Sequence, residues 1–119
     1  MDQAKAVASA NAFVQQLKQA PNNVSAREKL ARTFAEQLDQ PDRGIEQLAL
    51  LLNMPDQPDS KRAEWLGLTA AWHIKYRRDP DAGRKILERL IQEFPKSPQA
   101  FSARRRLQLL DNERQASGQ

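Results

Sequence analysis

The sequence contains no cysteine, a single histidine, four glycines and few aromatic residues (6%). The absence of cysteine excludes disulfide scaffolds, thiolate zinc sites, iron–sulfur clusters and cysteine nucleophiles. The longest apolar run, Leu48 to Leu52, is far too short to span a membrane, and residues 1–13 lack the apolar core of a secretory signal. With 39% hydrophobic residues, the chain has enough apolar residues to fold. We therefore expect a soluble domain, cytoplasmic by default, or the soluble domain of a membrane or envelope protein.

Residues that carry catalytic or metal chemistry are scarce. His73 has no acidic or histidine partner at the spacing that a zinc site needs. The glycines are isolated from one another, which does not match a phosphate-binding loop. Paired acids such as Asp79 and Asp81 flank a proline, where helix capping explains them better than a catalytic pair does. We predict no enzyme activity, no cofactor and no metal site.

Seven prolines divide the chain into segments of helical length, because proline breaks a helix interior but is tolerated in its first turn. Within these segments apolar residues recur every three or four positions, and no run alternates with the period of a strand. The predicted fold class is all-α, with five to six helices over residues 3–19, 24–39, 42–53, 59–77, 81–93 and 98–112. Residues 113–119 have no apolar anchor, and we expect a frayed tail there. Candidate helix-start residues are Asp39, Ser60, Asp79 and Ser97.

An internal repeat underlies these helices. The segment from Pro41 to Leu48 aligns with the segment from Pro80 to Leu87 at an offset of 39 (from 41 to 80), and the proline pair at 55 and 58 recurs at 95 and 98. A period near 40 residues predicts antiparallel helix-turn-helix units stacked as a short solenoid. Gly44 and Gly83 recur with the repeat, which favours close approach of neighbouring helices at both positions.

One segment, Trp65-x-x-Leu68-Thr69-x-x-Trp72, resembles the first-helix pattern of the tetratricopeptide repeat family. The second-helix positions of the pattern are occupied by Gly83, Leu87, Leu90 and Pro95. In the preceding repeat the same pattern is carried by Leu30, Ala31, Phe34, Gly44, Leu48, Leu51 and Pro55, and Arg27 stands at the tryptophan position. The segment from Phe94 to Ala100 is similar to a joint in bacterial tetratricopeptide-like proteins, including those of outer-membrane assembly and Tol–Pal systems.

The resemblance implies one domain over residues 1–119. In it, a capping helix (1–20) precedes repeats at 24–55 and 59–95, a last helix (98–112) and a tail (113–119). It also implies a non-enzymatic protein–protein interaction or scaffold function, with a protein or peptide as partner.

The charge distribution leaves an alternative open. Residues 60–119 hold thirteen Lys and Arg against seven Asp and Glu, whereas residues 1–59 hold six against eight. Three basic clusters lie on successive predicted helices: Lys75/Arg77/Arg78, Arg84/Lys85/Arg89 and Arg104/Arg105/Arg106. If they merge, the patch suits an anionic partner such as nucleic acid, acidic lipid or acidic peptide. If the clusters do not merge, their role is to keep the outer faces of the helices solvated. Nucleic acid ranks lower because no aromatic residue is interleaved with the clusters.

Partner-binding residues are predicted from the family register and from the basic half. The register implies a concave side formed by Ala63, Leu66, Ala70, His73 and Ile74, with Glu28 and Arg32 from the earlier repeat. The stripe of Trp65, Leu68 and Trp72 is expected in the core, although a shift of two residues exchanges the two stripes. The candidate partner-binding residues are Glu28, Arg32, His73, Arg77, Arg104, Arg105 and Arg106.

Overall fold

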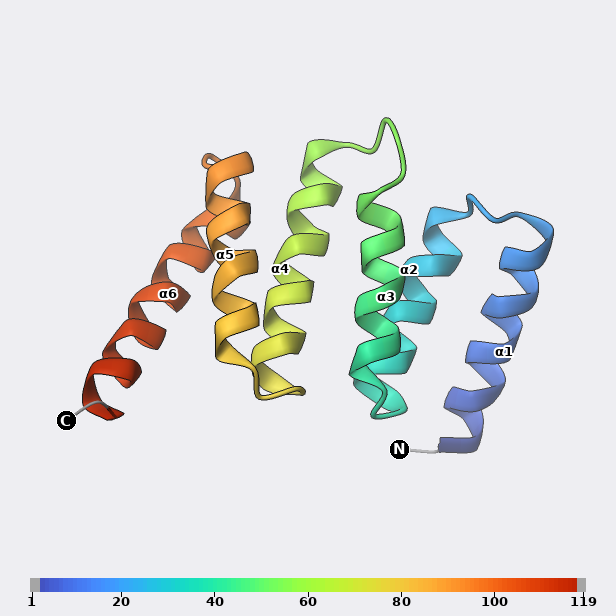
Figure 1. Cartoon of the computed structure of the whole chain (residues 1–119). Helices are drawn as coiled ribbons and strands as arrows, with labels where there is room; N and C mark the ends of the chain where they lie inside the picture. The colour runs from blue at the N-terminus through green and yellow to red at the C-terminus, as the bar shows by residue number, and fades with distance from the viewer. Residues whose placement is uncertain (1–2, 118–119) are drawn as a thin grey trace. The chain divides into compact units, whose positions relative to one another are not determined.

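The computed structural model describes residues 3–117, and the chain divides into two compact units, Met1–Pro55 and Asp56–Gln119. Unit 1 contains α1 (Gln3–Gln19), α2 (Val24–Arg32), the π-helical turn η1 (Thr33–Gln37) and α3 (Pro41–Leu52) (Figure 1). Unit 2 contains α4 (Asp59–Lys75), α5 (Pro80–Glu93) and α6 (Pro98–Ser117). The described residues include no strand, which confirms the all-α prediction. The single domain and the stacked solenoid stay predictions.

Unit 1 is built around α2, which packs against both α1 and α3. The core is formed by the apolar stripe of α1 and by residues of the second helix: Ala6, Ala10, Phe13, Val14, Leu17, Leu30, Phe34 and Leu38. Arg27 on α2 donates from Nη1 to Gln47 Oε1 on α3 at 2.7 Å and from Nη2 to the carbonyl oxygen of Pro21 at 3.0 Å. One guanidinium therefore links α3 to the loop that precedes α2.

The second helix differs from the predicted continuous helix over 24–39. Its α-helical part ends at Arg32, and the chain continues as the wider turn η1. The hydroxyl of Thr33 donates to the carbonyl oxygen of Lys29 at 2.8 Å, and the Leu38 amide donates to the carbonyl oxygen of Thr33, five residues earlier, at 3.0 Å. A threonine hydroxyl that bonds back to the preceding turn can bend a helix, but Thr69 makes the same bond to the carbonyl oxygen of Trp65 inside regular α4, so the hydroxyl alone does not explain the wide turn.

Unit 2 is a three-helix arrangement in which α5 contacts both α4 and α6. Successive helices are antiparallel (Figure 1), and near the start of α5 Arg84 forms an ion pair with Asp111 near the end of α6. Gly83 is buried, and a Cβ at this position would overlap Ile74 Cγ1 on α4 and lie 2.8 Å from Ile74 Cδ1. The predicted close approach is therefore confirmed at Gly83. Gly44, at the equivalent position of α3, is also buried.

The sequence repeat reappears as a repeated backbone turn. The turns that precede α3 and α5 each contain a residue in the left-handed region, Asp39 and Arg78, both with φ of 53°. Each helix then begins with a proline in its first turn. The same two bonds close both turns: Leu38 N to Thr33 O at 3.0 Å and Gln40 N to Phe34 O at 2.8 Å in the first, and Arg77 N to Trp72 O at 3.2 Å and Asp79 N to His73 O at 2.9 Å in the second. The repeat at an offset of 39 residues is thus present in the backbone structure as well as in the sequence.

Two of the four predicted helix-start residues act as caps. Asp79 Oδ1 accepts from the Ala82 amide at 3.1 Å, and Ser97 Oγ accepts from the Ala100 amide at 3.0 Å. Ser60 lies near the start of α4 as predicted but is not its cap, and the prediction is wrong for Asp39. Asp39 occupies the left-handed position, so Gln40 becomes the residue that precedes α3, whereas Ser60 already lies inside α4, after Pro58.

The last helix is longer than predicted. It runs to Ser117, so the expected end at 112 and the frayed tail are wrong for residues 113–117; residues 118–119 lie outside the described part. Leu110 is buried and Asp111 pairs with Arg84, which holds α6 against α5. Beyond this point strong helix formers continue the helix without an apolar contact. At the other end, the helix predicted over residues 3–19 is observed as α1, its role as a cap stays a prediction, and residues 1–2 are not described.

Candidate functional site

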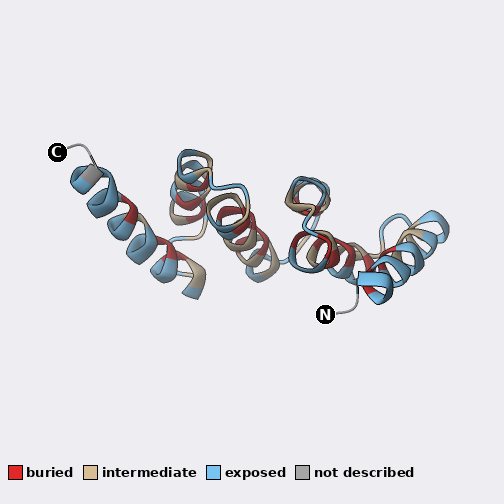
Figure 2. Cartoon of the chain, turned by 90° about the horizontal axis from the view of Figure 1, so that it is seen from below, coloured by how far each residue is buried: buried red, intermediate tan, exposed pale blue. Residues whose placement is uncertain are grey.

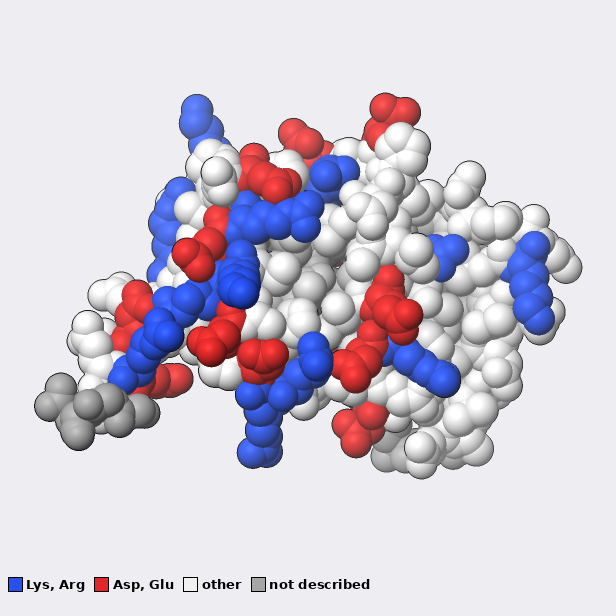
Figure 3. Space-filling model, in the orientation of Figure 1, with Lys and Arg blue, Asp and Glu red and all other residues white. Residues whose placement is uncertain are grey.

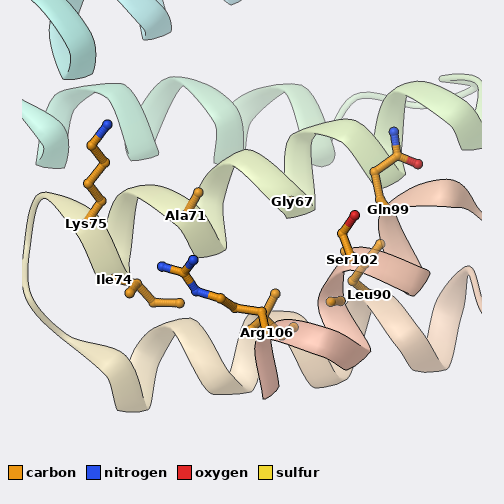
Figure 4. A pocket seen from close by; sticks show the side chains of 10 residues that line it. Gly67, Ala71, Ile74, Lys75, Leu90, Gln99, Ser102 and Arg106 are labelled. Carbon is orange, nitrogen blue, oxygen red and sulfur yellow. The ribbon is translucent and has the colours of Figure 1, made fainter. Parts of the chain in front are cut away.

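A cavity of about 360 Å³ opens between the three helices of unit 2 (Figure 4). One wall is a stripe of α4 and the other is the facing side of α6, while α5 contributes Leu87 and Leu90. The full lining is Gly67, Ala71, Ile74, Lys75, Leu87, Leu90, Gln99, Ser102, Ala103 and Arg106. Pockets of a few hundred cubic ångströms are large enough for a sizeable side chain or a small ligand.

The cavity is apolar inside and polar at its edges. Gly67 and Ala71 leave space beside α4 because they have little or no side chain. Ile74, Leu87 and Leu90 supply aliphatic surface. Gln99, Ser102 and Arg106 reach the cavity from α6, and the Arg106 side chain extends toward Ile74 and Ala71 (Figure 4). The arrangement suits an apolar group that also carries hydrogen-bond acceptors.

Two cations at this cavity have no acidic partner. Within residues 3–117, no carboxylate lies at ion-pair distance from Lys75 or Arg106. Lys75 Nζ lies 5.3 Å from the centre of the Tyr76 ring, and the Lys75 side chain points away from the cavity (Figure 4), so Arg106 is the cation whose charged group reaches the cavity. Some other cations of unit 2 are neutralised, as in the pair of Arg89 Nε with Glu93 Oε2 at 2.7 Å. An apolar hollow beside the uncompensated positive charge of Arg106 attracts an anionic group with an apolar neighbour.

The candidate residues chosen from the sequence are distributed over both units. Glu28 and Arg32 lie on α2 in unit 1, where Arg32 Nη1 is 3.5 Å from Glu36 Oε2. In unit 2, Arg77 Nη1 lies 3.3 Å from His73 Nδ1, at the end of α4. These four residues do not line the cavity, whereas Arg106 does.

The structure separates the basic cluster Arg104/Arg105/Arg106. Helical geometry rotates consecutive side chains by about 100°, so Arg106 turns toward the cavity whereas its neighbours do not. Arg104 Nη2 donates to the carbonyl oxygen of Pro95 at 3.0 Å, and its guanidinium lies 5.6 Å from the centre of the Phe101 ring. Arg105 is exposed. The three arginines therefore belong to two surfaces.

The residues expected on a concave face of α4 lie mostly in the core. Ala63, Leu66 and Ala70 have no exposed surface, because this stripe is closed in the folded chain. The open stripe is Gly67, Ala71, Ile74 and Lys75, so of the expected residues only Ile74 lines the cavity. The predicted core position of Trp65 and Trp72 is confirmed, since both are buried, whereas Leu68 is half-buried. A shift of about one residue in helical register separates the expected face from the observed one.

Acidic side chains neutralise part of the charge of the three basic clusters. Acidic side chains interrupt the Lys and Arg side chains on the face of unit 2 that Figure 3 shows. The ion pairs of Arg84 with Asp111 and of Arg89 with Glu93 account for two members of the second cluster. The charge excess is therefore confined to particular residues, among them Lys75 and Arg106 at the cavity and Arg105 on α6.

Other kinds of site have no counterpart in the described residues. No three His, Asp or Glu side chains of residues 3–117 are grouped as metal ligands would be. None of the helices in that range combines the length and the apolar character that crossing a membrane requires. Comparison of the chain with protein-family models, with curated proteins and with solved structures gives no match.

Proposed function

We propose that this chain is a non-enzymatic protein-interaction module of tetratricopeptide type, and that unit 2 binds a peptide segment of a partner protein in the α4–α5–α6 cavity. The observation that carries the proposal is the apolar cavity beside the guanidinium of Arg106, which no described carboxylate neutralises. The repeated turn, with left-handed Asp39 and Arg78 at an offset of 39, supports the assignment to a helical-repeat type.

The cavity chemistry defines the bound segment. Burial of one aliphatic or aromatic side chain on Ile74, Leu87 and Leu90 contributes about 1.5–3 kcal/mol. A carboxylate next to that side chain accepts from Arg106, and a charge-assisted hydrogen bond of this kind is roughly twice as strong as a neutral one. The segment we expect therefore has one large apolar residue within a few positions of Asp or Glu.

The test is selection of short displayed peptides on the whole chain, followed by affinity measurement with synthetic versions. We expect the selected sequences to share an apolar residue beside an acid. Ala71→Trp fills the cavity from an exposed position and Arg106→Glu reverses its charge, so each change is expected to weaken binding at least tenfold. The matched controls are Ala12→Trp on α1 and Lys85→Glu on α5, both exposed and outside the cavity.

The pattern of losses decides the proposal. Loss with the two cavity variants and retention with the two controls supports it. Selection that yields no peptide, or peptides that bind the Ala71→Trp variant as well as the unchanged chain, overturns it. Circular dichroism of each variant shows whether the helices are intact.

A further inference from the structure

The outer face of α6 is a second surface, separate from the cavity. We define it as the exposed positions Phe101, Arg104, Arg105, Gln108, Leu109 and Asn112. The ring of Phe101 is 67% exposed and Leu109 is 49% exposed, which makes them two of the few large apolar side chains left in water. In Figure 2, α6 shows exposed residues along most of its length, with buried residues on one side. An exposed aromatic and an aliphatic residue on one helix face mark an interaction surface.

This face carries positive charge and no acid. Arg104 and Arg105 lie between the two apolar residues, and Arg105 has no hydrogen-bond or ion-pair partner within residues 3–117. The two acids of α6 lie toward α5, where Asp111 pairs with Arg84 and Glu113 lines a hollow beside the same arginine. The face defined by these six positions is therefore cationic and apolar at once, although Asp111 and Glu113 beside it are also exposed.

We infer that the outer face of α6 docks on an anionic lipid surface. Phe101 and Leu109 would enter the headgroup region, while Arg104 and Arg105 would pair with lipid phosphates. Helices that lie in a membrane interface combine buried Phe or Leu with flanking Lys or Arg in this way. Anionic headgroups provide the complementary charge, which strengthens binding about fivefold for each cation near the surface.

The geometry favours a lipid surface over two other occupants. A second copy that used the same face would place Arg105 of each chain against a cationic face, and the face has no acid to compensate. Single-stranded nucleic acid needs successive open aromatic rings, whereas this face has one ring, and the Arg104 guanidinium already lies over it at 5.6 Å. A convex helix face with no groove fits a broad, deformable surface best.

The experiment is co-sedimentation of the whole chain with vesicles. The probes are vesicles of phosphatidylcholine alone and vesicles with equal parts of phosphatidylcholine and phosphatidylglycerol. We expect binding to the anionic vesicles and little or none to the neutral ones. Arg105→Gln is expected to weaken binding about fivefold. The pair Phe101→Ser and Leu109→Ser is expected to weaken it at least tenfold, because it removes both inserting groups.

A control with the same change in net charge separates docking from general attraction. Lys5→Gln with Lys18→Gln removes two cations from exposed positions of α1, and we expect less than a twofold effect. If the Lys5→Gln, Lys18→Gln variant loses as much vesicle binding as the Arg104→Gln, Arg105→Gln variant does, the vesicles attract the net charge of the whole chain. That result would overturn the inference. Arg105→Gln alters no contact of the folded chain, so the test does not depend on a variant that unfolds.

A depth measurement identifies the occupant. A Phe101→Trp variant is expected to be quenched by brominated lipid in anionic vesicles, whereas Trp65 and Trp72 of the unchanged chain are buried and are expected to stay unquenched. Absence of quenching at position 101 would overturn the inference. So would tighter binding to a short single-stranded DNA with the same dependence on Phe101 and Arg105, since the face would then recognise nucleic acid. These results are independent of the peptide test, because none of the altered residues lines the cavity.

Discussion

Replacement of Gly83 by alanine tests the helix packing that forms the floor of the site. The added Cβ would overlap Ile74 Cγ1, lie 2.8 Å from Ile74 Cδ1 and lie 3.3 Å from the carbonyl oxygen of Ala70. Carbon atoms in contact normally lie about 3.5–4.0 Å apart. Isoleucine in a helix keeps largely one rotamer, and the Ala70 oxygen belongs to the backbone, so neither neighbour moves away easily. Relief requires α4 and α5 to separate.

Two opposing effects set the size of the change. Overpacking of this kind costs about 1–3 kcal/mol, whereas replacing glycine with alanine in a helix stabilises it by up to about 1 kcal/mol. We expect Gly83→Ala to lower the free energy of unfolding by about 1–2 kcal/mol. Gly67→Ala is the matched control, because its Cβ would meet Gln99 Cγ at an ordinary 3.8 Å. We expect that variant to be as stable as the unchanged chain or slightly more stable.

Urea unfolding followed by circular dichroism measures both variants. A double-mutant cycle with Ile74→Ala isolates the contact, since Gly83→Ala becomes neutral or stabilising once the isoleucine side chain is gone. The reasoning is refuted if Gly83→Ala stabilises the chain as much as Gly67→Ala does. It is also refuted if the cost of Gly83→Ala is the same with and without Ile74.

Three further substitutions, one of them with a control, test other features of the fold. Asp79→Ala removes the cap of α5 and is expected to cost about 1 kcal/mol in urea unfolding, whereas Ser60→Ala, which removes no cap, is expected to change stability by less than about 0.5 kcal/mol. Arg78→Gly relieves the left-handed backbone at φ of 53° and is expected to raise the free energy of unfolding by about 0.5 kcal/mol, seen as a higher melting temperature. Trp72→Ala removes a ring that is 3% exposed and is expected to cost about 3–5 kcal/mol; a loss below about 1 kcal/mol would contradict its burial.

Helix number and approximate position follow from local signals that the sequence carries. The two signals are a proline at the start of α3 and α5 and apolar residues spaced by three and four positions. Each can be recognised within its own segment, without knowledge of the rest of the fold. The turn η1 is different, because it depends on which carbonyl the Leu38 amide selects, and propensity does not encode that choice. The left-handed backbone at Asp39 and Arg78 was also not predictable, because neither position holds the glycine that usually indicates this conformation.

The cavity was harder to predict than the core. Ala63 and Ala71 are the same residue type eight positions apart on one helix, yet the first is fully buried and the second lines the cavity. The family register selected the wrong one because a rotation of about 100° per residue makes the exposed face sensitive to a shift of a single position. The different orientations of Arg105 and Arg106 follow from the same rotation.

Localised amide shifts test the central claim most directly. The isotope-labelled whole chain would be titrated with a peptide selected as described under Proposed function, and backbone amide shifts would be followed by NMR. Peptide binding in the cavity predicts the largest changes at Gly67, Ala71, Ser102 and Ala103, with the amides of α1 unmoved. Saturable shifts that cluster on α1, or on the outer face of α6 around Phe101, with the cavity amides unchanged, would contradict it.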